Sequence, residues 1–230
     1  MRNFLVSITW KAFSLCFLLI FLSCSVLDSN QFAGGFKNAY DSMTKVVFGY
    51  KDEFITQDLV DSIPFASMKL KIGKGPSGLL ILESYNNSKL TWVSADNVYF
   101  IVKDGRIIRS AGLLNNLTDY QSSIYSFKQL LEERIGEREF VAYYSYDKPK
   151  LVEMKTKVLV KVYKNEKVPL LGQEKNLILI KETVENSYLG WKVENKYWID
   201  PSDAFVWKST QKISPKTPVI SYEITKKPAL

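Results

Sequence analysis

Hydrophobic and polar residues alternate along most of the chain beyond residue 65. This is the period of a β-strand that buries one face, and the short alternating runs are separated by glycine, asparagine or proline. The predicted strands are residues 66–72, 79–82, 90–94, 98–103, 106–109, 140–145, 156–163, 177–184, 191–199, 205–211 and 219–224. Short strands at regular spacing predict a mainly β fold, either an antiparallel sandwich or a barrel, with one or two short helices.

Two pairs of adjacent strands are joined by residues that favour tight turns. In Tyr85-Asn86-Asn87-Ser88, asparagine tolerates the left-handed backbone conformation that a hairpin turn requires. Asp104-Gly105 lies between two apolar runs and is the strongest hairpin signal in the chain. We therefore expect antiparallel hairpins at both places.

Helical segments are predicted at residues 30–48, 56–60 and 116–135. The first and third have apolar residues at helical spacing, whereas the second is a single further helical turn. In the second, Thr56 is a suitable N-cap, and Pro64 stops any continuation. The third prediction depends on the spacing of Tyr120, Ile124, Phe127, Leu130 and Leu131.

The first residues have the pattern of a secretory signal peptide. Arg2 and Lys11 are basic, residues 12–22 are almost entirely apolar, and Ser23 is small. A helix of that apolar core is only about 16 Å long at 1.5 Å per residue, whereas a bilayer core requires roughly 30 Å. We therefore predict a signal peptide over residues 1–23.

Phe21-Leu22-Ser23-Cys24 resembles a lipobox, the site at which lipoprotein signal peptidase cuts and the new terminal cysteine carries lipid. Cys24 is the predicted lipid attachment site, whereas Cys16 follows the bulky Leu15. Two or three acyl chains, such as palmitate, hold a protein durably on a membrane. The alternative is an uncleaved transmembrane anchor, in which Lys11 at mid-span costs about 3 kcal/mol.

Ser25 follows Cys24 where an inner-membrane retention signal usually has aspartate. By resemblance to enterobacterial sorting rules, this favours the periplasmic face of the outer membrane. Residues 24–230 are then one β-rich periplasmic domain, with possible halves at 52–115 and 138–225.

Composition narrows the chemistry. Of the 230 residues, 46% are apolar and 24% charged, which is typical of a folded domain, and none is histidine. The commonest general base and metal ligand is therefore missing, and both cysteines are used or removed at the N-terminus, so we expect no metal and no cofactor. Cleavage removes Arg2 and Lys11 and lowers the formal net charge from +7 to +5. This modest, dispersed charge does not favour nucleic-acid binding.

Acid/base chemistry by paired carboxylates, as in glycosidases, remains open. The nearest pairs in the sequence are Asp200 with Asp203, Glu132 with Glu133, and Glu137 with Glu139. Solvated surface charge is the simpler interpretation of each pair, because lysine and arginine lie close by.

Several separated motifs occur in a fixed order: Ile63-Pro64-Phe65-Ala66-Ser67-Met68, Trp92-Val93-Ser94-Ala95-Asp96, Asp104-Gly105-Arg106, Arg109-Ser110-Ala111-Gly112-Leu113, Tyr197-Trp198-Ile199-Asp200-Pro201, Val206-Trp207-Lys208-Ser209-Thr210-Gln211 and Pro215. From about residue 42 to the end, the chain resembles the YjbF/GfcB (YmcC) family of lipoproteins. Two departures stand out: Ala204 occupies a turn position where that family usually has glycine, and residues 117–144 match poorly.

The resemblance implies an exported lipoprotein of exopolysaccharide or capsule production without known catalytic residues. The expected partners are other polysaccharide-export proteins, an outer-membrane component or the glycan itself, including an acidic polysaccharide. The expected role is that of an accessory or assembly factor in secretion. A carbohydrate-binding module and a carboxylate-based glycan hydrolase are the alternatives.

Individual residues of these motifs have structural interpretations that we prefer. Trp92, Trp191, Trp198 and Trp207 are expected in the core rather than on a sugar-binding surface. Arg109 is expected to pair with a buried carboxylate such as Asp96.

The best local candidate for glycan or partner contact is the cluster of Tyr143, Tyr144 and Tyr146 near Lys148 and Lys150. Aromatic rings stack on sugar faces, and lysines bind carboxylates or phosphates.

Overall fold

The computed structural model describes residues 55–95, 98–123 and 126–229. The predicted signal peptide, Cys24, the predicted helix at 30–48, Asp96 and Ile124 lie outside the described residues. No helix within the described ranges is long and apolar enough to cross a bilayer.

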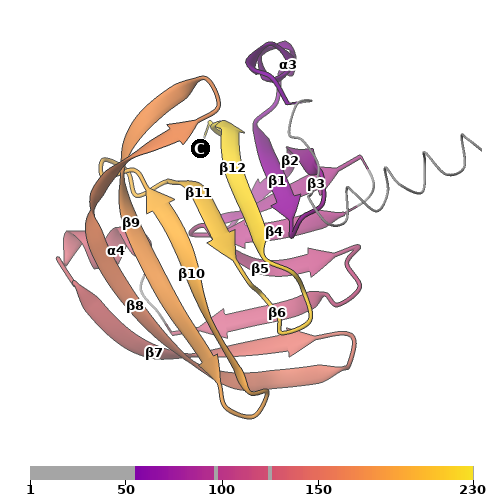
Figure 1. Cartoon of the computed structure of the whole chain (residues 1–230), viewed down its shortest axis with the longest axis vertical. Helices are drawn as coiled ribbons and strands as arrows, with labels where there is room; N and C mark the ends of the chain where they lie inside the picture. Colours follow the sequence, from indigo (N-terminus) through magenta and orange to yellow (C-terminus); the bar gives the residue numbers. More distant parts are fainter. Residues whose placement is uncertain (1–54, 96–97, 124–125, 230) are drawn as a thin grey trace, which may run out of the picture. The chain divides into compact units, whose positions relative to one another are not determined.

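The described residues form twelve strands and two short helices (Figure 1). The strands are β1 (Ser67–Ile72), β2 (Ser77–Asn86), β3 (Lys89–Ser94), β4 (Tyr99–Lys103), β5 (Arg106–Ala111), β6 (Leu117–Ser122), β7 (Glu137–Tyr146), β8 (Leu151–Leu170), β9 (Gln173–Asn186), β10 (Trp191–Ile199), β11 (Val206–Gln211) and β12 (Ile220–Lys226). Their order in the sheet is β5-β4-β3-β2-β1-β12-β11-β10-β9-β8-β7-β6, and neighbouring strands pair antiparallel.

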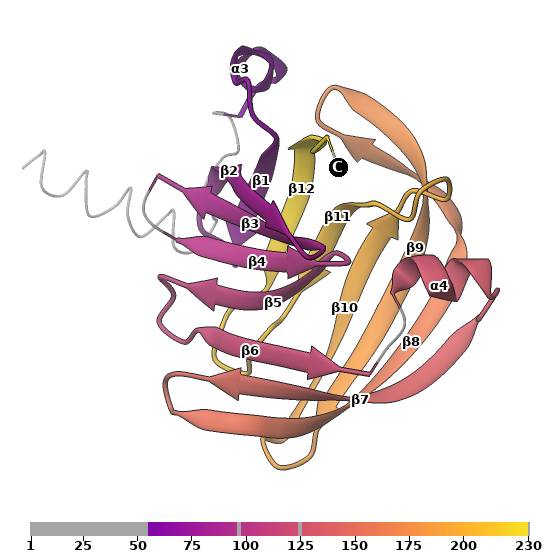
Figure 2. The ribbon, with the colours of Figure 1, turned by 180° about the vertical axis from the view of Figure 1, so that it is seen from behind.

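The sheet curls into a nearly closed barrel, so that its two end strands, β5 and β6, lie beside each other (Figures 1 and 2). Side chains connect these two strands. The Arg109 Nε donates to the Thr118 carbonyl at 2.8 Å, and the Leu117 N–H donates to the Ser110 Oγ at 3.0 Å. The predicted mainly β, antiparallel, barrel-like fold is confirmed.

Local turn chemistry matches the predictions. Asp104 and Gly105 have φ of 48° and 76°, and Asn87 and Ser88 have φ of 48° and 61°. Both pairs therefore occupy the left-handed conformations of two-residue hairpins. Ala204 also has a positive φ, 60°, at the position where the resembled family has glycine.

The first helix, α3 (Gln57–Ser62), begins after the N-cap Thr56, whose side chain accepts from the Leu59 N–H as predicted. The second, α4 (Phe127–Glu132), is much shorter than the helix predicted at 116–135. It starts at a capping box formed by Ser126 and Gln129.

The helix predicted at residues 116–135 is wrong in its first half, because residues 117–122 form strand β6, which pairs with β7. In the strand, Leu117 is fully buried, and the Tyr120 ring contacts the Tyr144 ring edge-on at 5.0 Å. The register of β6 is irregular between Leu117 and Asp119, so Leu117 and Tyr120 lie opposite the buried Tyr146 and Tyr144 although they are three positions apart. The spacing of these residues therefore suits a helix as well as this irregular strand. The backbone partners supplied by β7, distant in sequence, decide between the two.

Strands β8 and β9 extend well beyond the predicted 156–163 and 177–184. Residues 163–167 are mostly polar, and the register is irregular between Val162 and Asn165. The extension forms a hairpin that reaches β12, where the Leu171 N–H donates to the Glu223 carboxylate. This segment lacks the alternation on which strand prediction depends.

Candidate functional site

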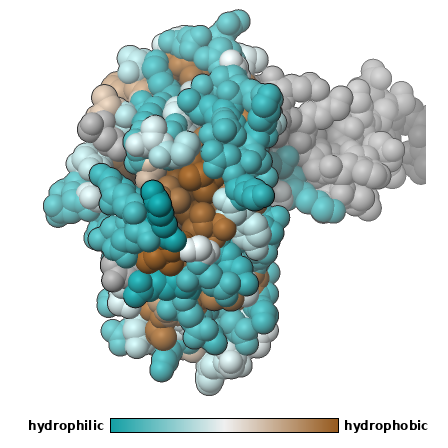
Figure 3. Space-filling view, turned by 90° about the vertical axis from the view of Figure 1, so that its left-hand side faces the viewer, coloured by the Kyte–Doolittle hydropathy of each residue, from teal (hydrophilic) through white to brown (hydrophobic). Residues whose placement is uncertain are grey.

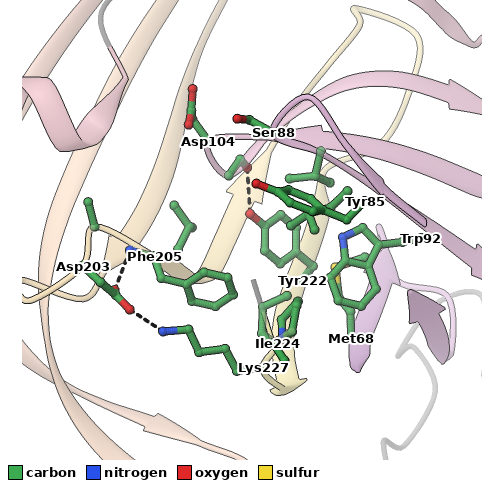
Figure 4. Close-up of a pocket in the computed structure, with 17 residues that line it drawn as sticks. Met68, Tyr85, Ser88, Trp92, Asp104, Asp203, Phe205, Tyr222, Ile224 and Lys227 are labelled. Carbon is green, nitrogen blue, oxygen red and sulfur yellow. Dashed lines mark hydrogen bonds and ion pairs between the residues drawn. The ribbon is translucent and has the colours of Figure 1, made fainter. Parts of the chain in front are cut away.

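A pocket of about 620 Å³ opens at one end of the barrel, where three turns distant in sequence meet (Figure 4). Ser88 comes from the β2–β3 turn, Asp104 and Gly105 from the β4–β5 turn, and Asp203 and Ala204 from the β10–β11 turn. Left-handed residues in all three turns make them tight. These turns form part of the rim, and strand residues and the C-terminal segment complete the lining.

The inner wall of this pocket is apolar. Met68 and Trp92 are fully buried, and Val206, Tyr222 and Ile224 line the wall beside them. At the mouth, the Tyr85 side chain is 51% exposed and Phe205 is half-buried (Figure 4). Figure 3 shows apolar side chains recessed between polar ones on the face that lies to the left in Figure 1.

Charged side chains at the mouth are largely paired. Lys227 forms an ion pair with Asp203, and its Nζ lies 4.7 Å from the centroid of the Phe205 ring. The other Asp203 oxygen accepts from the Phe205 N–H at 2.9 Å. These contacts fix the orientation of the Phe205 ring at the opening.

Gly105 is required where the β4–β5 turn enters the barrel. A Cβ at this position would lie 2.3 Å from a methyl carbon of Val206, and its φ of 76° is also unfavourable for other residues. Its carbonyl accepts from the Tyr222 hydroxyl at 2.7 Å and from the Gln211 Nε2 at 2.8 Å. The turn is thus held against β11 and β12.

Next to Gly105, a charged pair is buried inside the barrel. The Arg106 and Glu182 side chains are only 5% and 3% exposed, and their charged groups approach to 2.6 Å. The Arg106 Nε donates to one Glu182 oxygen at 2.8 Å, and the Tyr197 hydroxyl donates to the other at 2.8 Å. The guanidinium also lies 3.8 Å from the centroid of the Phe127 ring of α4.

The electrostatics of the buried pair follow from this geometry. Burial disfavours the charged guanidinium, but the neighbouring Glu182 carboxylate outweighs it and raises the pKa of Arg106 above its usual range. Burial, followed by the negative charge of Glu182, raises the pKa of the Tyr197 hydroxyl well above its ordinary value. Burial also raises the pKa of Tyr120 to about 12. Arg106 therefore stays charged and both tyrosines stay neutral at physiological pH.

A smaller pocket of about 330 Å³ lies on the other side of the Asp104 turn. Lys89, Lys103, Asp104 and Asp119 contribute its charged rim. Lys89 and Lys103 are opposite each other in the β3–β4 ladder. Arg106 also lines this pocket but is paired with Glu182, and the other two basic and two acidic side chains balance, so the pocket has no strong preference for one sign of charge.

The structure does not bring together the predicted tyrosine and lysine cluster. Tyr143, Lys148 and Lys150 are exposed, but Tyr144 and Tyr146 are buried. The alternation of β7 places Tyr143 outside the barrel and the other two inside it, where the Tyr146 hydroxyl donates to the Ile213 carbonyl at 3.0 Å. An aromatic surface of three tyrosines is therefore not formed.

Among the described residues, which do not include Asp96, Arg109 has no buried carboxylate as a partner. Its side chain is exposed and bonds to the Thr118 carbonyl, whereas Arg106 is the buried arginine. The register of β5 against β4 is irregular between Ile107 and Arg109, so simple alternation along the strand does not predict which of the two arginines is buried. Glu182 lies 76 positions after Arg106, on the same strand face as the apolar Ile180 and Val184. Alternation is consistent with its burial but does not identify its partner.

The four tryptophans considered in the sequence differ in burial. Trp92, Trp191 and Trp207 are buried, whereas Trp198 is half-buried and its Nε1 donates to Glu166. The Trp92 and Trp191 indole N–H groups have no hydrogen-bond acceptor among the described residues.

The carboxylate pairs proposed for hydrolysis lie at the surface. Glu137 and Glu139 form ion pairs with Lys161 and Lys157, at 3.1 Å and 2.7 Å. Glu132 lies near Lys128, one helical turn away. Within the described ranges, no group of three or more potential metal ligands is present.

Asp200 and Asp203 stabilise the β10–β11 turn. Asp200 accepts from the Ser202 N–H and hydroxyl and from the Trp207 indole. Partial burial of the Asp200 carboxyl opposes its ionisation, but these hydrogen bonds prevail and lower its pKa. Both carboxylates therefore have structural partners.

A family model, a curated relative and a solved structure all relate this chain to the same group of lipoproteins. Residues 40–225 match the family described as "Group 4 capsule polysaccharide lipoprotein gfcB, YjbF". An uncharacterized lipoprotein GfcB of Escherichia coli K12 is 23% identical over 83 residues, which span 36% of this chain and only 39% of that relative. The crystal structure of the hypothetical lipoprotein YmcC from Escherichia coli K12 is 17% identical and superposes with a TM-score of 0.63, covering 83% of this chain and 96% of YmcC. The structural match establishes the shared fold.

Proposed function

This chain belongs to the YjbF family of group 4 capsule polysaccharide lipoproteins, and from that premise we propose that it is an accessory or assembly factor in exopolysaccharide or capsule secretion. In this proposal, Cys24 carries the lipid and tethers the barrel to the periplasmic face of the outer membrane. Other export proteins and the glycan are the proposed partners.

The observation that carries the proposal is the family match, which includes every described strand through most of β12. The packed interior supports a role through surface contacts. Large side chains fill the barrel, and the Arg106–Glu182 pair links β5 to β9 across it. A filled barrel presents its outer surface and its ends to partners.

Carbohydrate binding is a second candidate function, favoured by the pocket at the barrel mouth with its exposed Tyr85 and its polar rim. Glycan hydrolysis has less support, because the described carboxylate pairs considered for it are at the surface, with lysine or turn partners.

The test uses a deletion strain of the native host complemented with wild type, Cys24→Ala or Cys16→Ala. Cys16→Ala is the matched control, since it removes a thiol within the predicted signal peptide. We expect wild type and Cys16→Ala to incorporate labelled palmitate, to fractionate with the outer membrane and to restore secreted polysaccharide. Cys24→Ala is expected to incorporate no palmitate, to leave the outer-membrane fraction and to restore no secreted polysaccharide. Unchanged secretion in the deletion strain contradicts the accessory role, and unchanged fractionation of Cys24→Ala contradicts the anchor.

A further inference from the structure

We infer that the pocket between the β2–β3, β4–β5 and β10–β11 turns binds an uncharged sugar unit of a glycan. This inference rests on the proposed function, which supplies a polysaccharide as the partner. It adds the site, the side chains that contact the sugar and the charge class of the sugar. The volume, about 620 Å³, lies in the range of small-molecule sites.

Aromatic rings at the mouth supply the surface on which a sugar ring stacks. Tyr85 and Phe205 come from opposite sides of the opening, from β2 and from the β10–β11 turn (Figure 4). A pyranose has a face of C–H groups and an edge of hydroxyl groups, so it fits an aromatic surface with polar groups around it. Tyr85 is half exposed although it is a large apolar ring, which leaves its face available to a ligand.

Two polar side chains at the rim are available for sugar hydroxyls. The Asp104 carboxylate and the Ser88 hydroxyl line the pocket, and neither forms a hydrogen bond or ion pair with any other residue of the described ranges. A carboxylate accepts two or more hydrogen bonds, and a hydroxyl both donates and accepts. Both residues sit at left-handed positions of tight turns, which places them at the rim of the pocket.

The Trp92 indole gives an independent indication of a ligand. Its ring is fully buried in the pocket wall, and its N–H has no acceptor within the described part of the chain. The nitrogen-bearing edge faces the interior of the pocket (Figure 4). A buried donor without a partner is unfavourable and is rare in folded proteins. In this inference a ligand oxygen accepts from the Trp92 N–H, which requires the lining side chains to move because the nitrogen itself is inaccessible.

The charges at the pocket select against acidic sugars. Three charged side chains line the pocket, namely Asp104, Asp203 and Lys227. Lys227 is paired with Asp203, so their charges cancel. The unpaired Asp104 leaves the mouth with a negative charge. A uronic acid or a phosphate placed there is repelled, whereas a neutral hexose donates its hydroxyls to the carboxylate.

The experiment uses the full lipidated protein in nanodiscs with ¹⁵N-labelled tryptophan indoles. The probes are glucose, galactose, mannose, fucose and N-acetylglucosamine, with galacturonate as the acidic probe and laurate as the acyl-chain probe. At least one neutral sugar is expected to shift the Trp92 indole signal in a saturable way, and galacturonate is not. No response to any neutral sugar, or a stronger response to galacturonate, overturns the inference.

Two variants and two matched controls locate the site. Tyr85→Ala removes the stacking surface, and Asp104→Asn removes the charged acceptor. Each variant is expected to lower the affinity for the neutral sugar about tenfold. Tyr188→Ala removes a tyrosine that is 82% exposed in the β9–β10 turn, and Asp58→Asn changes an exposed carboxylate of α3. Neither residue lines the pocket, so neither control is expected to change binding.

Four outcomes separate the possibilities. Sugar binding unaffected by Tyr85→Ala and Asp104→Asn overturns the site, and saturable laurate binding in place of sugar assigns the pocket to an acyl chain instead. Sugar binding together with normal secretion in the deletion strain refutes the accessory role and leaves the site standing. Absent sugar binding together with defective secretion refutes the site alone.

Discussion

Removing one member of the buried Arg106–Glu182 pair should destabilise the barrel strongly. Glu182→Gln keeps the size of the side chain but leaves the Arg106 charge, only 5% exposed, without its counterion. Breaking a buried pair in this way costs about 3–5 kcal/mol. Each kcal/mol lowers the melting temperature of a domain of this size by about 2–4 °C, so we expect a decrease of roughly 10 °C.

A double-mutant cycle separates the pair from its surroundings. Arg106→Met and Glu182→Met together replace the two charges by apolar side chains, and such a replacement is often close to neutral. We therefore expect the double variant to be more stable than either single variant, with a coupling of at least about 2 kcal/mol. Urea unfolding followed by circular dichroism measures all four proteins. Additive effects, or single variants that cost less than about 1 kcal/mol, would refute the reasoning.

Three further predictions concern the backbone turns and the buried tyrosines. Gly105→Ala should lower the free energy of unfolding in urea by at least about 2 kcal/mol, because it combines a positive φ with a clash against Val206. Gly136→Ala is the control, since its added Cβ meets nothing within 4 Å. An equal loss of stability in both variants would contradict this prediction. Ala204→Gly should stabilise by up to about 1 kcal/mol, since residue 204 has φ of 60°, and a lower melting temperature would refute this. Burial raises the pKa of Tyr120 to about 12, so the unfolded chain loses this proton first, and stability should fall as the pH rises above 10; unfolding free energies that stay constant from pH 9 to 11.5 would contradict this.

The strands and hairpins could be predicted from the sequence because their signals are local. Alternation identified the buried faces, and Asp104-Gly105 identified a turn that the structure confirms. Strand β6 was missed because its pairing with β7 is a tertiary effect that competes with a helical spacing of the same residues. The β8–β9 extension was missed because its residues do not alternate.

The pocket was beyond local prediction for a different reason. Ser88, Asp104 and Asp203 are brought together only by the closure of the barrel, and nothing in their own neighbourhoods indicates a common site. The same holds for Arg106 and Glu182, whose burial depends on the faces of two distant strands. By contrast, three motifs of the resembled family contribute Met68, Trp92 and Val206 to the pocket wall, so the resemblance contained information that periodicity lacked.

The intact mass of the mature protein purified from its host membrane tests the lipid-anchored account most directly. The account predicts a chain that begins at Cys24 and carries a diacylglycerol together with an N-linked acyl chain. A mature chain that begins at another residue without lipid would contradict it.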